Sequence, residues 1–250
     1  FKNILDFELF KNSLTKFINK ELDDEYSSFD ISGAGSFIDE FDEETGFIEE
    51  QLSQSAEESK APDFITNLNE LYLNGKLSDI YGRSEEVGLL IETISKKNKC
   101  NAILTGEAGV GKTAIVEYLA QKICNAEVPT NLLGMEILSV DIGSMLAGTQ
   151  YRGQFEQKFK SLLTVASKNP NIILFFDEIH TIFGAGGNQE GGLDAANMLK
   201  PLLARGEIKC IGATTSAEYE KIFKKDSAMK RRFFNVDIDE PSKEETKNIL

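Results

Sequence analysis

The sequence has few of the residues that build a metal centre or a disulfide framework. It contains one histidine, His180, and three cysteines, Cys100, Cys124 and Cys210, with no CxxC pair among them. An odd number of separated cysteines is typical of buried, reduced thiols in a cytosolic protein, and one histidine cannot complete a metal site with them. We therefore expect a cytoplasmic protein in which His180 has a structural rather than a catalytic role.

Long apolar runs and an excess of basic residues are also absent. No apolar run reaches the roughly 20 residues that a membrane-spanning helix needs, so we expect a soluble protein with no membrane partner. Lys and Arg number 27 against 41 Asp and Glu, a net charge of −14. Residues 21–60 hold fourteen of these acids and one lysine, and the rest of the chain is nearly neutral. Without a strong basic patch, nucleic acid is not expected to be the main partner.

Composition divides the chain into four parts. Residues 1–22 predict an amphipathic helix, which we interpret as the tail of an upstream N-terminal domain. Residues 23–61 are acidic and rich in Ser and Gly, which is typical of a flexible linker. A piece of it that mixes Phe and Ile with acids is either a docking segment or a plain spacer. Residues 62–241 alternate apolar and helical stretches, and residues 242–250 begin a further helix.

Five short apolar runs predict a parallel sheet in the central part. They are rich in Ile, Leu, Val and Phe without alternation, as strands covered on both faces should be, and helical stretches lie between them. The runs are NAILTG, EILSVD, NIILFFD, IKCIGATT and FFNVDID. The expected fold class is therefore α/β, a five-stranded parallel sheet flanked by helices. Ahead of it, DFITNLNELYLNG predicts one helix capped by Asp63 and ended by Gly75.

The segment GEAGVGKT fits the phosphate-binding pattern G-x-x-x-x-G-K-[ST]. It lies between the strand NAILT and the helix KTAIVEYLAQKI, which is the context that this pattern requires. The glycines let backbone N–H groups turn toward phosphates, and the helix N-terminus adds partial positive charge. Lys112 is expected to reach the β- and γ-phosphates of ATP, and Thr113 to hold Mg²⁺. The expected ATP-binding residues here are Gly106, Glu107, Ala108, Gly109, Val110, Gly111, Lys112, Thr113 and Ala114.

Two carboxylates, Asp177 and Glu178, directly follow the strand NIILFF. In a parallel sheet this position is the carboxyl edge, beside the phosphate loop. Asp177 is expected to hold Mg²⁺ directly or through water, and Glu178 to polarise a water for attack on the γ-phosphate. The pair therefore predicts ATP hydrolysis as well as ATP binding.

Taken together, these segments resemble a known family. GEAGVGKTAIVEYLA, SVDIGSMLAGTQYRGQFEQKFKSLL, FFDEIHTIFGAG, IGATT and KRRFF, in this order, are similar to the first ATPase module of the Clp-type AAA+ protein unfoldases. The stretches FITNLNELYLNGKLSDIYGR and LDAANMLKPLLARGEI are most like the ClpA branch. The resemblance implies an AAA+ large subdomain over residues 62–241 and a truncated start of the helical lid over residues 242–250.

The resemblance also implies roles for residues outside the phosphate loop. Tyr81 and Gly82 match a segment that lines the adenine pocket, and Thr215 matches a polar sensor of the γ-phosphate. Arg231 and Arg232 match arginine fingers that reach the nucleotide of a neighbouring subunit. An arginine supplied in this way neutralises charge on the transferring phosphoryl group.

Tyr151 matches the aromatic residue of a mobile pore loop, flanked here by Gly148 and Gly153. The glycine-rich stretch GAGGNQEGG resembles a second pore-facing loop. The resemblance thus implies a homohexameric, ATP-dependent unfoldase and translocase that threads unfolded or tagged proteins through its pore. It would be the ATPase subunit of a ClpAP-like protease, with a ClpP-like peptidase and a ClpS-like adaptor as partners, and not itself a peptidase.

Three alternatives stay open at this point. A ClpB-like disaggregase would have the same module but no peptidase partner. An AAA+ ATPase that acts on nucleic acid would keep the ATP site but need basic pore residues, which are not found. A nucleotide-switched scaffold without enzymatic activity would have no need for the water-activating base expected at Glu178.

Overall fold

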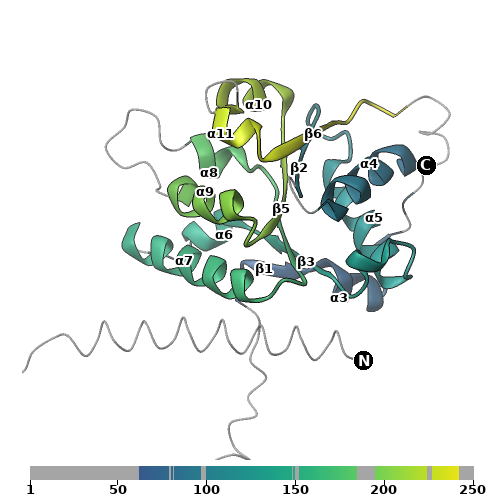
Figure 1. Ribbon diagram of the computed structural model, residues 1–250, viewed down its shortest axis with the longest axis horizontal. Coiled ribbons are helices and arrows are strands. Elements are labelled where there is room, and N and C mark those ends of the chain that lie inside the picture. The colour runs from purple at the N-terminus through teal and green to yellow at the C-terminus, as the bar shows by residue number, and fades with distance from the viewer. Residues whose placement is uncertain are drawn as a thin grey trace, which may run out of the picture.

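The computed structural model describes residues 62–78, 80, 82–96, 100–147, 149, 152–184, 195–223 and 227–241. The predicted N-terminal helix, the acidic linker and the start of the lid lie outside these residues. Tyr81, Tyr151 and most of the second glycine-rich loop also lie outside them. The described part folds into one six-stranded sheet with helices on both faces (Figure 1).

The five strands that the sequence predicts are all present and run parallel to one another. They lie in the order β3-β4-β5-β2-β6, and a short sixth strand, β1, is added antiparallel to β3. The strands are β1 (Ile65–Asn67), β2 (Asn101–Thr105), β3 (Glu136–Val140), β4 (Ile172–Phe176), β5 (Lys209–Thr214) and β6 (Phe233–Asp237). All residues of β2 and β4 are buried, which explains why these runs are apolar without alternation. The predicted α/β class is confirmed.

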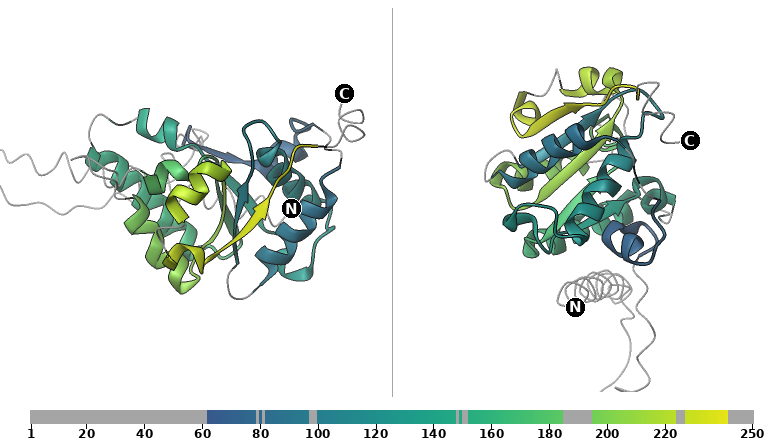
Figure 2. Two further views of the ribbon diagram at one scale, coloured as in Figure 1. Left: turned by 90° about the horizontal axis from the view of Figure 1, so that it is seen from above. Right: turned by 90° about the vertical axis from the view of Figure 1, so that its right-hand side faces the viewer.

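Helices cover the two faces of the sheet in separate groups (Figures 1 and 2). One group, α3 to α5, packs on one face, and α6 to α9 pack on the other. The helices are α3 (Leu68–Leu73), α4 (Ser84–Ser95), α5 (Lys112–Cys124), α6 (Ile142–Ala147), α7 (Arg152–Lys168), α8 (His180–Gly184), α9 (Ala195–Arg205), α10 (Ser216–Phe223) and α11 (Ser227–Lys230). No helix in these ranges has both the length and the apolar composition needed to cross a membrane.

Successive residues of the central strands join two different hydrophobic cores, one on each face of the sheet. In β4, for example, Ile173 and Phe175 join the core beneath α4 and α5, whereas Leu174 and Phe176 join the core beneath α7 and α9. On the second face, the rings of Phe155 and Phe159, one helical turn apart on α7, stack on each other, and Phe159 also contacts the ring of Phe176. This two-sided burial holds the carboxyl ends of β4, β5 and β2 side by side at one edge.

The prediction of one helix from Asp63 to Asn74 is wrong at its start. Ile65–Asn67 pairs with β3, and α3 begins only at Leu68. The helix cap is Asn67, whose side chain accepts hydrogen bonds from the N–H groups of Asn69 and Glu70 and donates to Glu136. Local periodicity favours helix here, but the backbone groups of Ile65–Asn67 find their partners on the edge of β3 instead.

Candidate active site

The phosphate loop joins the end of β2 to the start of α5. Gly109 (φ 83°) and Gly111 (φ 95°) both adopt positive φ, which side-chain-bearing residues rarely adopt. Gly111 is the N-cap of α5, and no side chain caps this end of the helix. The N–H groups of the first turn therefore face outward with the positive end of the helix dipole, as an anion-binding site requires.

Lys112 lies folded back over the loop that precedes it. Its ammonium group donates to the carbonyl oxygens of Gly106 (2.9 Å) and Glu107 (2.7 Å). The side chain is half-buried, and it places a positive charge on the same side of the loop as the open helix end. These weak carbonyl partners are ones that a phosphate oxygen can replace, because hydrogen bonds between two charged groups are stronger.

Thr113 and Asp177 meet in the structure although 64 positions separate them in the chain. The Thr113 hydroxyl donates to Oδ2 of Asp177 at 2.8 Å, and Oδ1 of Asp177 accepts from the N–H of Glu178 at 3.0 Å. Both side chains are exposed to the cleft. A hydroxyl and a carboxylate are the hard oxygen ligands that Mg²⁺ uses together with substrate phosphates and waters. The donor set therefore fits the predicted Mg²⁺ site.

Glu178 follows Asp177 with an unusual backbone. Its φ of 53° lies in the left-handed region, where a residue with a side chain is strained. The next residue, Ile179, is fully buried, and its N–H donates to the carbonyl oxygen of Ala213 on β5 at 2.9 Å. The bend thereby turns the Glu178 side chain out into the cleft, while Ile179 anchors the chain beneath it.

Two threonines at the end of β5 lie between the phosphate loop and Asp177. The Thr215 hydroxyl oxygen accepts from the N–H of Glu218 at 3.3 Å and caps α10, which leaves its own hydrogen free to donate. Thr214 Oγ1 lies 3.1 Å from Nδ1 of His180. His180 thus connects the segment after Glu178 to the predicted sensor strand, and it also lines the cleft; its structural role stays a prediction.

A cleft of about 720 Å³ along this edge gathers eight of the predicted site residues. Lys112, Thr113, Asp177, Glu178 and Thr215 all line it, together with Ala108, Gly109 and Gly111. Among the other loop residues, Glu107 is exposed and Ala114 half-buried, whereas Gly106 and Val110 are buried.

One acidic residue of this cleft, Asp141, was not predicted from the sequence. Asp141 lies at the end of β3, as Asp177 does at the end of β4, and this shared position was the available signal. The Ser144 side chain and backbone N–H donate to its carboxylate, and these hydrogen bonds lower the pKa of Asp141 below its usual value.

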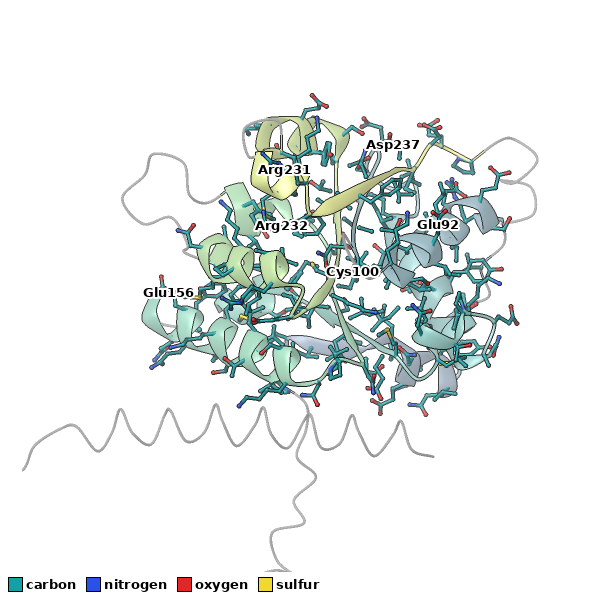
Figure 3. All side chains as sticks on the ribbon, viewed as in Figure 1. Glu92, Cys100, Glu156, Arg231, Arg232 and Asp237 are labelled. Carbon is teal, nitrogen blue, oxygen red and sulfur yellow. The ribbon has the colours of Figure 1, made fainter. Side chains whose placement is uncertain are left out.

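Arg231 and Arg232 do not reach this cleft in their own chain. They precede β6, whose first residue pairs with the first residue of β2, whereas the phosphate loop follows the last residue of β2. A strand of five residues spans roughly 15 Å. Figure 3 accordingly shows both arginines at the start of β6 and Asp237 at its other end. Arg231 is exposed, so its side chain is accessible to a neighbouring molecule.

The two predicted adenine-pocket residues differ in what the structure describes. Gly82 is exposed, with a φ of 75°, just ahead of α4. Tyr81 lies outside the described residues, as does the predicted pore tyrosine, Tyr151.

An open helix N-terminus, a lysine, and a threonine–aspartate pair followed by glutamate define the site of a P-loop nucleotide triphosphatase. Residues 102–238 match the family AAA, the ATPase family associated with various cellular activities. The chain belongs to this family.

Comparison with individual proteins places the chain among the Clp-type members. It is 53% identical over 196 residues to the chaperone protein ClpB of Aquifex aeolicus, covering 78% of this chain and 19% of that protein. It is 47% identical over 200 residues to the ATP-dependent Clp protease ATP-binding subunit ClpC of Staphylococcus saprophyticus, covering 80% of this chain and 24% of that protein. The predicted resemblance to the Clp-type family is confirmed; the particular likeness to ClpA is not.

The fold agrees with a solved structure of the same kind. The S. cerevisiae Hsp104–ADP complex superposes with a TM-score of 0.68 at 42% sequence identity, covering 75% of this chain and 26% of that one. The chain thus spans about a quarter or less of the length of these relatives.

Proposed function

We propose that this chain is an ATPase module of a Clp-type protein unfoldase, which couples ATP hydrolysis to the remodelling of protein substrates. The observation that carries the proposal is the 2.8 Å contact between Thr113 and Asp177 at the open N-terminus of α5, with Glu178 next in the chain. A module that only bound nucleotide would not need an acid aimed into the cleft beside its Mg²⁺ ligands.

The chain's own residues divide the chemistry among them. The N–H groups of the loop and of the first turn of α5 bind the phosphates, and Lys112 leaves its carbonyl partners to contact the β- and γ-phosphate oxygens. Thr113 and Asp177 would hold Mg²⁺, which neutralises charge on the phosphates when it is bound. Glu178 accepts a proton from the attacking water, and the Thr215 hydroxyl orients the γ-phosphate.

The site is completed by a second subunit in this proposal. Arg231 and Arg232 lie at the end of β6 remote from their own phosphate loop, so they act on nucleotide only if a neighbour's cleft faces them. This arrangement supports a ring of subunits, for which we propose the homohexamer of the family. Hydrolysis would then move the Tyr151 loop, which grips an extended polypeptide in the central pore.

Sequence identity supports the disaggregase branch over the ClpAP-like reading. The ClpB of Aquifex aeolicus, a ClpB of Nostoc and the heat shock protein 104 of Schizosaccharomyces pombe are 50–53% identical to the chain. We therefore place a ClpB-like disaggregase, which works without a peptidase, ahead of a ClpP- and ClpS-dependent role. The peptidase-dependent role stays the second candidate because the ClpC relative is 47% identical.

The two candidates differ in what happens to the substrate. Full-length protein is incubated with ATP and a heat-aggregated reporter enzyme, with and without a ClpP-like peptidase. We expect reporter activity to return in both reactions. Degradation of the reporter only when the peptidase is present would instead establish the second candidate, and no effect of ATP on the reporter would contradict both.

The same reaction tests the pore loop. Tyr151→Ala should keep ATP hydrolysis but lose reporter recovery, because the aromatic side chain that contacts the polypeptide is removed. Tyr151→Phe, which keeps the ring, is the matched control and should retain recovery. Equal recovery by the alanine variant would remove Tyr151 from the proposal.

A further inference from the structure

Arg83 follows the predicted adenine segment and lies in an unusual conformation. It is the N-cap of α4, with a φ of 60° in the left-handed region. Its side chain is only 9% exposed, although arginine is rarely buried in proteins unless it is paired. A strained backbone and a buried charge at one residue indicate that its contacts hold it there.

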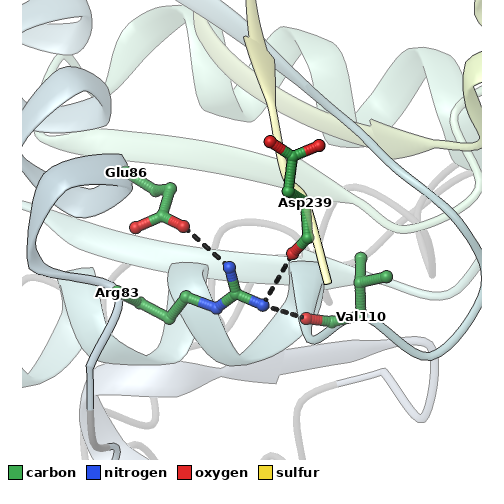
Figure 4. A network of polar contacts seen from close by, with 4 residues as sticks. All are labelled: Arg83, Glu86, Val110 and Asp239. Atoms are coloured by element: carbon green, nitrogen blue, oxygen red, sulfur yellow. Dashed lines mark hydrogen bonds and ion pairs between the residues drawn. The ribbon is translucent and has the colours of Figure 1, made fainter. Parts of the chain in front are cut away.

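The guanidinium group of Arg83 joins three segments of the chain (Figure 4). Nη1 pairs with Oε1 of Glu86, one turn into α4, at 2.7 Å. Nη2 donates to two backbone carbonyl oxygens at 2.9 Å each, those of Val110 in the phosphate loop and of Asp239 after β6. Glu86 fixes the orientation of the planar group, so Nη2 is held between the two carbonyls.

The contact with Val110 bears directly on phosphate binding. In a trans peptide the C=O and N–H groups point in opposite directions. A carbonyl of Val110 that is held toward Arg83 therefore keeps the N–H of Gly111 directed away from Arg83. Gly111 lines the cleft and caps α5, so this peptide has to keep its orientation if its N–H is to meet a phosphate.

The contact with Asp239 links the same loop to the chain that follows β6. The N–H of Ile238 donates to the carbonyl oxygen of Thr105 at 2.7 Å, and a Cβ at Gly106 would collide with the carbonyl oxygen of Ile238. Residues 238–239 therefore lie directly against the start of the phosphate loop. Arg83 adds a second connection between the loop and this segment through its bonds to Val110 and Asp239.

We infer that Arg83 is a positioning residue for nucleotide binding, which fixes the Val110–Gly111 peptide of the phosphate loop and ties it to the segment after β6. The inference rests on the proposed nucleotide site. Arg83 itself does not line the cleft, and it acts through the loop peptide.

The test is isothermal titration of the full chain with Mg²⁺–ADP. Arg83→Ala should raise the Kd about tenfold, because a buried hydrogen bond from a charged donor to the loop is lost. Arg83→Lys should raise it about threefold or more, since an ammonium cannot reproduce the planar fork. Lys96→Ala is the matched control: it removes an ion pair with Glu92 at the far end of α4 and a cation–π contact with Phe234, and it should leave the Kd unchanged.

Binding stoichiometry separates positioning from folding. A mispositioned loop raises the Kd at unchanged stoichiometry, whereas partial unfolding lowers the stoichiometry at unchanged Kd. An Arg83→Ala variant that binds like the wild type overturns the inference alone. If that variant does not fold, Arg83→Lys with a wild-type Kd overturns it. A wild type that binds no better than Lys112→Ala overturns the proposed nucleotide site and the inference together.

Discussion

Gly212 on β5 should be the glycine that holds the carboxylate of Glu178, the proposed catalytic base, in place. A Cβ added at this position would lie 2.6 Å from Cδ1 and 2.9 Å from Cγ2 of Ile179. Ile179 directly follows Glu178, and its buried side chain anchors the strained bend there. Gly212→Ala should therefore push Ile179 outward and displace Glu178, although neither residue is itself changed.

The size of the expected destabilisation follows from the close approach of the added methyl group to Ile179. Forcing one methyl group into a packed core costs about 1–3 kcal/mol of unfolding free energy. At about 2–4 °C per kcal/mol for a domain of this size, the Tm should fall by roughly 5 °C. Because small misplacements of a catalytic group are costly, kcat for ATP hydrolysis should fall about tenfold. The Kd for nucleotide should change little, since the phosphate loop is not touched.

Thermal unfolding by circular dichroism and steady-state ATPase assays of the full-length protein measure these effects. The matched control is Gly88→Ala in α4, where a Cβ would meet nothing within 4 Å. There the same substitution should stabilise the fold by about 0.5–1 kcal/mol, because alanine favours helix. A second substitution, Ile179→Ala, should make the Gly212 change less harmful than it is alone. An unchanged Tm and kcat for Gly212→Ala would refute the reasoning.

Three further predictions concern single side chains. Lys112→Ala should abolish calorimetric binding of ATP, whereas Lys122→Ala at the other end of α5 should not; equal affinities would contradict the phosphate-loop role. Glu178→Gln should bind ATP but stop its turnover, and full hydrolysis by this variant would rule out Glu178 as the base. Burial strongly raises the pKa of the Cys210 thiol. Cys124 is only half-buried, so a thiol reagent at pH 8 should modify it first, and Cys210 only after unfolding; equal native rates would contradict the burial.

The Gly212→Ala and Glu178→Gln variants both act on the bend at Glu178, whose backbone is strained. A left-handed conformation costs a residue with a side chain about 1–2 kcal/mol. The Ile179 hydrogen bond to Ala213 and the packing of Ile179 over Gly212 offset that cost. The carboxylate is therefore held outward by its neighbours, and a substitution behind the bend should affect catalysis more than binding.

Local sequence determined the parts of this protein that depend on near neighbours in the chain. The five apolar runs predicted five parallel strands, because strands covered on both faces are rich in apolar residues; β2 and β4 are buried throughout, whereas β6 is partly exposed. The pattern GEAGVGKT between a strand and a helix predicted the phosphate loop, because its glycines and its helix end are consecutive in the chain. Asp177 and Glu178 were predicted for the same reason, directly after a recognisable strand.

Only the tertiary structure decided the features that depend on distant partners. Ile65–Asn67 became a strand because an edge of β3 was open to it, which no helical periodicity could reveal. Arg83 acquired its buried contacts from Val110 and Asp239, 27 and 156 positions away. Gly212 has little room for a side chain because Ile179, from another segment, fills the space beside it. In each case the stabilising or restricting contact is made between segments that are far apart in the sequence, so the local sequence cannot predict it.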